Sequence, residues 1–259
     1  MPESPEVQAL AEEFGARLSG RVLTAVDVVE FRSTKTRARP PETLVGEALT
    51  AAARRGKLLD LSFGERGHLV VSLGRHGWAR WGGAEVKAVA EAEPGSDGAV
   101  EAAPPALVVL DFDDGSALEL TDAGSWVSLG CWVVDDPMAV PAVAKLGADP
   151  ADPAFSRAQF DAAVAGRRKQ VKAVLQDQES LAGIGNAYSD EILFTARLSP
   201  IGHAAALSSE ELDHLFEATV GVIPGAIEAR RGVPIARLKE AKIAAMQVHG
   251  RAGEACPAC

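Results

Sequence analysis

The sequence predicts an α+β fold, in which an N-terminal helix and an antiparallel β-sandwich or barrel precede a helical domain. Strand patterns recur between residues 22 and 134, and turn residues separate them at short intervals. Helical patterns replace the strand patterns after residue 137. Because 259 residues are enough for two cores, we assign residues 1–135 to a first domain and residues 136–248 to a second.

The first element is predicted to be an amphipathic helix over residues 5–18. Its apolar residues keep spacings of three and four positions, and Gly20 can terminate it. Ser4 is a suitable N-cap, and Pro5 fits the first helical position.

Two hairpins are predicted next, each from a pair of apolar segments around a turn that contains glycine. The paired segments are 58–63 with 68–73, and 107–112 with 117–120. A last strand is expected over residues 126–134, with Cys131 as a buried apolar residue within it. Residues 91–105 are rich in Ala, Pro, Gly and acidic side chains, a composition typical of a mobile loop.

Helical patterns occupy four segments of the second domain, at residues 160–175, 187–197, 210–222 and 224–231. Between the first two segments, Gly183 and Gly185 permit tight turns, and Asn186 stands where an N-cap belongs. Exposed N–H groups at such a helix start can bind a phosphate. The alternative is a purely structural turn between two helices.

The formal net charge of −10 argues against a nucleic-acid partner, whereas the distribution of charge argues for one. Most of the 26 basic residues lie in three stretches, at 32–57, 167–172 and 230–251. Three solvated faces are the alternative. The sequence has no apolar run of 18 residues, no secretory-signal pattern at its start and too few cysteines for a disulfide framework. We therefore expect a cytoplasmic location.

The first three residues, Met1-Pro2-Glu3, contain a candidate nucleophile. Removal of Met1 would expose the secondary amine of Pro2. An α-amine titrates near pH 7.7–8, against about 10.4 for lysine, so a useful fraction is neutral at physiological pH. Such an amine suits attack on a sugar carbon to form an imine. The alternative is that Pro2 only begins the helix.

Two further positions are candidates for binding or catalysis. Lys57 follows a glycine turn at the entrance to a strand, which suits a phosphate clamp or a general acid; a surface lysine is the alternative. Arg75 and His76 lie on a glycine-flanked tip between strands. Such a tip can enter a stack of bases, and an ordinary charged hairpin is the alternative.

Four separated motifs carry a resemblance to a known family. They are Pro2-Glu3 with the following Pro-Glu-Val, Arg-Gly-Lys57, residues 175–191 and residues 249–259, in this order. Together they resemble the formamidopyrimidine-DNA glycosylase/endonuclease VIII family of base-excision repair enzymes, and the resemblance covers essentially the whole chain. It implies a β-sandwich domain, a helical domain with a helix–two-turn–helix, and a DNA cleft between them.

The resemblance also implies roles for the matching residues. Pro2 would attack C1′ of the damaged nucleotide, and Glu3 would protonate the sugar ring oxygen. Lys57 would contact a phosphate or base near the lesion and help β-elimination. The residues expected to contact DNA are Arg75, His76, Trp126, Lys172, Asn186 and Arg251.

The chain departs from the family pattern in two places. Residues 249–259 hold only the first half of a zinc-finger motif, and Cys256 and Cys259 supply two of the four ligands that a structural zinc ion needs. We expect zinc only if the chain continues beyond Cys259, and no cofactor for catalysis. Arg75 replaces a methionine of the purine-specific members, and Trp126 ends the segment that aligns with their Arg-Arg-Phe. Trp126 is either an aromatic plug or a core residue, and the preferred lesion stays open.

These features predict a bifunctional DNA glycosylase and abasic-site lyase that acts on oxidised or ring-opened bases. Its partner would be double-stranded DNA with a damaged base or abasic site, and the protein would act as a monomer near the nucleoid. The first alternative is a catalytically weak or inactive damage-binding protein on the same scaffold. A protein-interaction module is the second.

Overall fold

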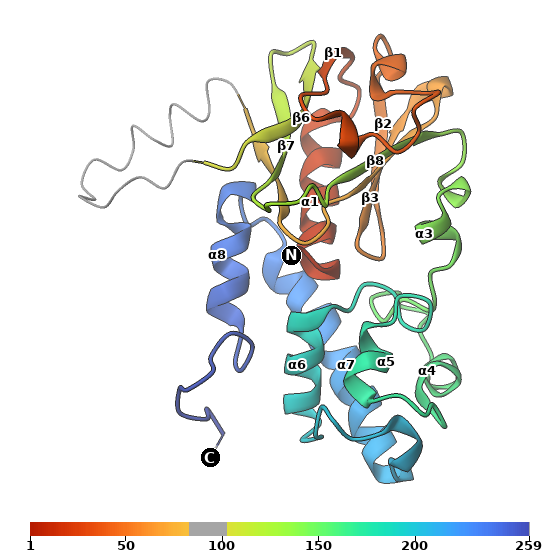
Figure 1. Ribbon diagram of the computed structural model, residues 1–259, viewed down its shortest axis with the longest axis vertical. Helices are drawn as coiled ribbons and strands as arrows, with labels where there is room; N and C mark the ends of the chain where they lie inside the picture. Colours follow the sequence, from red (N-terminus) through yellow and green to blue (C-terminus); the bar gives the residue numbers. More distant parts are fainter. Residues whose placement is uncertain (83–102, 259) are drawn as a thin grey trace, which may run out of the picture. The chain divides into compact units, whose positions relative to one another are not determined.

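The computed structural model describes residues 1–82 and 103–258 (Figure 1). The chain separates into two compact units. The sheet unit consists of Met1–Pro2, Leu10–Ala53 and Leu58–Val140, and the helical unit consists of Glu3–Ala9, Arg54–Lys57 and Pro141–Cys259. Most of the predicted loop at 91–105 lies outside the described residues.

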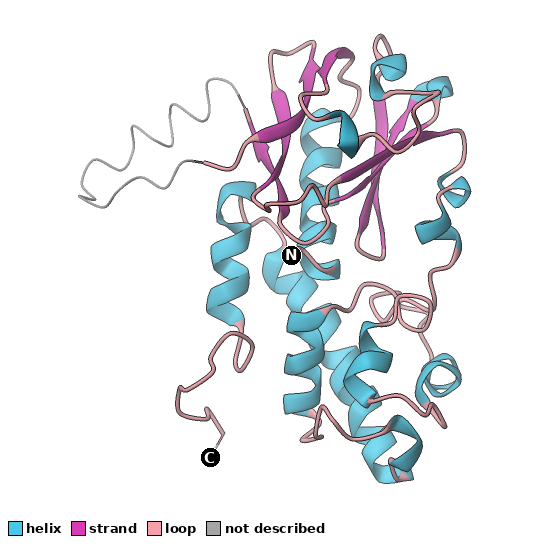
Figure 2. Cartoon of the chain, viewed as in Figure 1, coloured by secondary structure: helices cyan, strands magenta, loops and turns pink. Residues whose placement is uncertain are grey.

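The sheet unit contains two four-stranded sheets, with strand orders β1-β6-β7-β5 and β2-β3-β4-β8 (Figure 2). The strands are β1 (Leu23–Asp27), β2 (Leu49–Arg55), β3 (Leu58–Phe63), β4 (His68–Ser72), β5 (Gly77–Trp81), β6 (Ala106–Phe112), β7 (Ala117–Asp122) and β8 (Gly130–Val134). Short 3-10 helices occur at Phe31–Ser33, Pro41–Leu44, Gly64–Arg66 and Pro137–Ala139.

Both predicted hairpins are confirmed. Strands β3 and β4 pair antiparallel with Leu59 opposite Val71, and β6 and β7 pair antiparallel with Leu110 opposite Leu118. All four of these side chains are fully buried. Residues opposite one another on paired strands lie on the same face of the sheet, and here that face packs on the core.

The predicted last strand begins too early in the sequence. Strand β8 starts at Gly130, because the Asp122 carboxylate accepts hydrogen bonds from the N–H groups of Gly124, Ser128 and Leu129. These bonds fold the preceding segment into a loop instead of a strand. Trp126 lies in this loop with 81% of its surface exposed, so its interpretation as a core residue is wrong.

Helix α1 (Ser4–Leu18) confirms the predicted amphipathic helix. Val7, Leu10 and Phe14 share its fully buried face. The expected N-cap is wrong, because the helix begins at Ser4 and the capping position falls on Glu3. The backbone N–H of Glu3 donates to Glu6 Oε2 at 2.9 Å, the second half of a capping box.

The helical unit contains six helices among its described residues. They are α3 (Pro141–Ala144), α4 (Arg157–Val164), α5 (Val171–Gln176), α6 (Asn186–Thr195), α7 (Ser209–Arg230) and α8 (Ile235–Ala245), with a 3-10 turn at Ala204–Ala206. The predicted helix at 160–175 is two helices, because the chain turns at Gly166 with φ of 72°. The two segments at 210–222 and 224–231 form one helix, α7, with Pro224 inside it.

Helices α4 to α7 share one hydrophobic core. Phe160, Val174, Ile192 and Leu215 bring one buried side chain from each of these helices. Capping boxes define the starts of α4 and α7, with Ser156 and Ser208 as the N-caps. None of the described helices is long and apolar enough to cross a lipid bilayer.

Candidate active site and DNA-contact residues

The Glu3 carboxylate caps the N-terminus of α6. Its Oε2 accepts the N–H groups of Gly185 at 2.5 Å and Tyr188 at 3.3 Å, and its Oε1 accepts the N–H of Ala187 at 2.9 Å. The first N–H groups of a helix lack partners within the helix, and the positive end of the helix dipole favours an anion there. Glu3, only 2% exposed, is therefore fixed in orientation by three backbone donors.

Two glycines let the chain approach Glu3 this closely. Gly183 has a φ of 88°, and its carbonyl accepts the N–H of Ser4 at 3.0 Å. A Cβ at Gly185 would lie 2.4 Å from Glu3 Cδ, well inside van der Waals contact. The Gly-x-Gly spacing thus brings the start of α6 against the carboxylate.

Asn186 differs from its expected position. The N-cap of α6 is Gly185, and Asn186 is the first helical residue, exposed at the surface. Its Oδ1 accepts a hydrogen bond from Gln176 Nε2 at 3.2 Å. The N–H groups expected to bind a phosphate instead bind the carboxylate of Glu3, so the anion at this helix start belongs to the protein.

A buried ionic cluster surrounds Glu3. Glu6 is fully buried, and its Oε1 accepts the hydroxyl of Tyr188 at 2.7 Å. Lys242 Nζ lies 3.0 Å from Glu6 Oε2 and 3.5 Å from Glu3 Oε1, and Arg230 Nε lies 3.8 Å from Glu6 Oε1. Burial raises the pKa of Tyr188, and Glu6 raises it further, so the hydroxyl stays a proton donor.

Lys57 lies in the turn between β2 and β3, directly after Gly56, whose φ is 57°. Burial lowers the pKa of Lys57; the charge of Glu3 raises it, and the charge of Lys242 lowers it further. The net effect is a lowered pKa, so a larger fraction of Lys57 is neutral than at a surface lysine.

Pro2 immediately precedes Glu3 in the chain and is buried. The peptide bond between them makes the candidate nucleophile the direct neighbour in sequence of the residue whose carboxylate is fixed. While Met1 is attached, the Pro2 nitrogen is an amide, so nucleophilic chemistry requires removal of Met1.

In the sheet unit, two neighbouring loops carry three of the predicted DNA contacts. The N–H of Arg75 donates to Ser128 Oγ at 3.0 Å, which joins the tip after β4 to the loop before β8. His76 lies against that same loop, since a Cβ at Gly124 would come within 2.8 Å of its ring. The structure thus brings Arg75 and His76, both exposed, to the loop that carries Trp126.

Two of the predicted DNA contacts in the helical unit, Lys172 and Arg251, already bind protein groups. Lys172 Nζ lies 2.6 Å from Asp190 Oδ1, and the other oxygen of Asp190 binds His249 Nδ1 at 2.9 Å. Arg251 donates to the carbonyl of Met246 at 2.7 Å and pairs with Glu254 at 2.9 Å. Both side chains are thus held by protein groups, and each keeps further N–H donors with which it could contact a phosphate.

Only one cysteine of the predicted zinc half-site lies in the described part of the chain. Cys256 is exposed and Cys259 lies outside the described residues. Within residues 1–82 and 103–258, no group of three or more His, Cys, Asp or Glu side chains is arranged to hold a metal ion. A tetrahedral structural zinc ion needs four ligands, so the expectation that zinc binds only in a longer chain stays a prediction.

Four members of the cluster around Glu3 were missed from the sequence, namely Glu6, Tyr188, Arg230 and Lys242. Glu6 had a usable signal, because it stands three residues after Glu3 as in a capping box. The other three come from distant helices, and local patterns cannot pair them with the start of α1.

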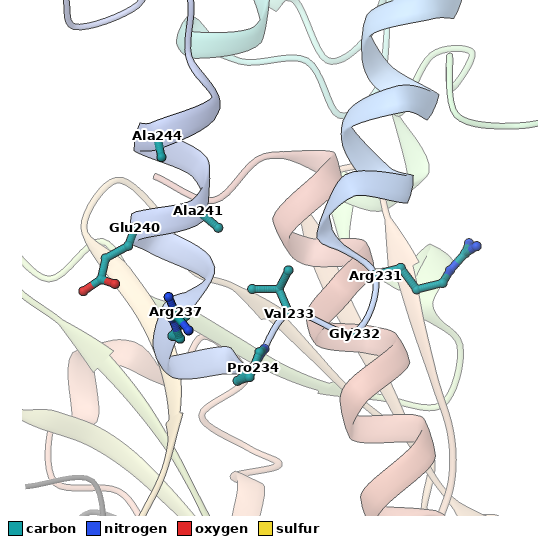
Figure 3. Close-up of a pocket in the computed structure, with 8 residues that line it drawn as sticks. All are labelled: Arg231, Gly232, Val233, Pro234, Arg237, Glu240, Ala241 and Ala244. Carbon is teal, nitrogen blue, oxygen red and sulfur yellow. The ribbon is translucent and has the colours of Figure 1, made fainter. Parts of the chain in front are cut away.

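Helix α8 also lines a separate pocket, of about 540 Å³ (Figure 3). Figure 3 shows Arg231 extending away from the α8 side chains that border the pocket. The lining residues are Arg231, Gly232, Val233, Pro234, Arg237, Glu240, Ala241 and Ala244. None of them belongs to the cluster around Glu3, so the pocket and the cluster are separate features of the helical unit.

Comparison with known proteins identifies the family. Residues 1–126 match the family described as formamidopyrimidine-DNA glycosylase N-terminal domain, and residues 146–235 match the formamidopyrimidine-DNA glycosylase H2TH domain. A relative from Moorella thermoacetica, named formamidopyrimidine-DNA glycosylase, is 32% identical over 269 aligned residues, which cover 100% of this chain and 92% of the relative.

Solved structures agree with this. The MutM (Fpg) protein of Thermus thermophilus superposes with a TM-score of 0.78 at 26% identity, over 100% of this chain and 91% of that one. Lactococcus lactis formamidopyrimidine-DNA glycosylase, solved non-covalently bound to DNA containing an AP site, shares the fold at 22% identity and a TM-score of 0.78, over 99% and 91% of the two chains. The chain belongs to the formamidopyrimidine-DNA glycosylase family of enzymes.

Proposed function

We propose that this protein is a DNA glycosylase with abasic-site lyase activity, which removes oxidised or ring-opened bases through an imine formed by Pro2. The observation that carries the proposal is the Glu3 carboxylate, fixed by three backbone N–H groups directly after the candidate nucleophile. A carboxylate held this rigidly next to an amine is suited to move a proton during imine formation.

The first stage breaks the bond between the sugar and the base. After Met1 is removed, the neutral amine of Pro2 attacks C1′, and the base leaves with the electron pair of the C1′–N bond. The amine loses its proton to Glu3. Glu3 then delivers that proton to the ring oxygen, the C1′–O4′ bond breaks, and the nitrogen lone pair forms the C1′=N bond of the iminium.

The second stage cuts the strand. The iminium withdraws electrons from C2′, a base removes a proton there, and the 3′ phosphate leaves as the C2′–C3′ double bond forms. Lys57 is suited to accept this proton, because its lowered pKa increases the neutral fraction of the amine. Water then hydrolyses the imine and regenerates Pro2.

The exposed loops of the sheet unit would contact the DNA once the target nucleotide has rotated out of the duplex. The target base must leave the duplex before Pro2 can reach C1′, and damage that weakens stacking lowers this cost. Trp126, 81% exposed, offers an aromatic face to the stack, and Arg75 and His76 lie beside its loop. Lys172, Asn186 and Arg251 would contact the phosphate backbone.

Borohydride trapping tests the proposal directly. Mature protein, with Met1 removal verified by intact mass, is mixed with a duplex that contains one abasic site and then reduced. We expect a covalent adduct from this protein, and a much lower yield from Glu3→Gln. Pro2→Gly, which replaces the secondary amine at the terminus with a primary amine, is the matched comparison for the nucleophile.

Absence of any adduct from protein that lacks Met1 would overturn the proposed chemistry. A gel-shift assay run beside a nicking assay then tests the remaining alternative, a protein that binds damaged DNA without cutting it. Damage-dependent binding without incision would identify a binding protein on this scaffold. A panel of duplexes, each with one lesion, would name the substrate.

A further inference from the structure

Helix α8 carries a single ammonium group into the buried cluster around Glu3. Ile235, Leu238 and Lys242 share one face of the helix and are 4%, 0% and 7% exposed. The first two are ordinary apolar contacts. A buried lysine on the same face is strongly disfavoured by the loss of its hydration unless it is paired, so its position calls for a specific partner.

Lys242 contacts both carboxylates at the start of α1. Its Nζ lies 3.0 Å from Glu6 Oε2 and 3.5 Å from Glu3 Oε1, and 5.0 Å above the ring of Tyr188. The shorter distance shows that Glu6 is the main partner. The ring adds a smaller attraction between the ammonium and the π electrons.

Glu6 in turn holds the peptide bond that joins Pro2 to Glu3. The N–H of that peptide bond donates to Glu6 Oε2 at 2.9 Å, the same oxygen that binds Lys242. A chain of contacts therefore leads from α8, through one carboxylate oxygen, to the backbone between the candidate nucleophile and the candidate acid.

The other cation beside Glu6 holds it less closely than Lys242 does. Arg230 Nε lies 3.8 Å from Glu6 Oε1, beyond hydrogen-bond distance, and this Nε has no hydrogen-bond partner in the described part of the chain. Loss of Lys242 would leave Glu6 without a hydrogen-bonded cation in a buried site.

We propose that Lys242 is a positioning residue for this chemistry, which fixes Glu6 and, through it, the peptide bond between Pro2 and Glu3. The inference rests on the proposed function. It assigns no contact between Lys242 and the DNA.

Removal of the ammonium has a second, electrostatic consequence. The charge of Lys242 is one of the causes that lower the pKa of Lys57, so its removal raises that pKa. The step that needs neutral Lys57 then requires a higher pH. The charged and titratable groups shown to act on Lys242 are Glu3 and Glu6 at the start of α1, Lys57 from the β2–β3 turn and Tyr188 from α6. Arg230 from α7 lies on the other oxygen of Glu6.

The test compares four variants of the mature protein on an abasic-site duplex, with single-turnover strand cleavage measured as a function of pH. Lys242→Met removes the charge and the donor, Lys242→Gln keeps a donor without charge, and Lys242→Arg keeps both. Lys239→Met is the matched control, because it removes a lysine from the exposed face of the same helix.

We expect Lys242→Met to slow cleavage by about 10- to 100-fold, the scale of a misplaced reacting group, with unchanged affinity for a reduced abasic site. The acid limb of the rate profile should move to higher pH in both Met and Gln variants at position 242. Lys242→Arg should restore most of the rate, and Lys239→Met should match the wild type.

A wild-type rate and pH profile in folded Lys242→Met would overturn the inference. If that variant does not fold, Lys242→Gln decides, and an unshifted acid limb there counts equally against it. A wild-type protein that neither cleaves nor forms an adduct would instead refute the proposed function, whatever the variants do.

Discussion

Gly185→Ala is the sharpest test of how the site is built. The backbone of Gly185 is extended, with φ of −125° and ψ of −156°, so its φ is not in the left-handed region that favours glycine. The added Cβ, however, would lie 2.4 Å from Glu3 Cδ, where ordinary contact begins near 3.4 Å. The carboxylate must therefore move by about 1 Å, the difference between these distances.

That displacement acts on the hydrogen bonds that fix Glu3. The shortest, from the N–H of Gly185 at 2.5 Å, cannot survive it unchanged. One lost bond to a charged group costs about 1.5–3 kcal/mol of unfolding free energy. A misplacement of about 1 Å at a reacting group costs about 100-fold in rate, which we expect for adduct formation.

Borohydride trapping measures the rate of adduct formation, and denaturant unfolding measures the free energy of unfolding. Gly221→Ala in α7 is the control, because its Cβ would meet nothing within 4 Å and the helix should gain about 0.5–1 kcal/mol. Wild-type rates of adduct formation by folded Gly185→Ala would show that the position of the Glu3 carboxylate does not limit the reaction.

Three further predictions concern the sheet unit. Trp126→Ala should weaken binding to an abasic-site duplex without lowering the melting temperature, since the ring is 81% exposed; equal weakening on undamaged duplex would contradict a role in filling the gap. Although burial opposes ionisation of Asp122, hydrogen bonds from its loop lower the pKa of this carboxyl. The contribution of ionised Asp122 to the free energy of unfolding is therefore complete above about pH 3.9, the pKa in the unfolded chain, and is lost as the pH falls through the lower pKa of the folded protein. Asp122→Asn should flatten the acid limb of a curve of stability against pH. Burial raises the pKa of the Cys131 thiol to about 12, so a thiol reagent should modify Cys131 only after unfolding, with exposed Cys256 as the internal control in a peptide mass map.

Local patterns were sufficient for the regular elements that bury one face. The apolar spacing of α1 and the two hairpins follow from short-range rules, because periodicity reports which side of an element meets the core. Helix α8 was missed, since its buried face includes Lys242, which breaks the apolar pattern. The merging of two segments into α7 was missed because Pro224 is tolerated within that helix.

Some residues of the candidate site could likewise be predicted from the sequence, and others could not. Pro2, Glu3 and Lys57 were identified from the order of motifs along the chain, and Trp126 was left between two interpretations. Its exposure depends on Asp122, whose carboxylate bends the loop four residues away. A side chain that binds three backbone N–H groups leaves no periodic trace in the sequence.

The sequence by itself determined the family, the candidate nucleophile and the helical segments that became α1 and α6, which meet at Glu3. Only the tertiary structure decided that Glu3 caps α6, across 182 residues, and that Lys242 pairs with Glu6, across 236. Short-range patterns record which face of an element is buried, whereas the partner of a buried charge depends on which faces pack together. That choice is made by the whole core, and no local stretch of residues encodes it.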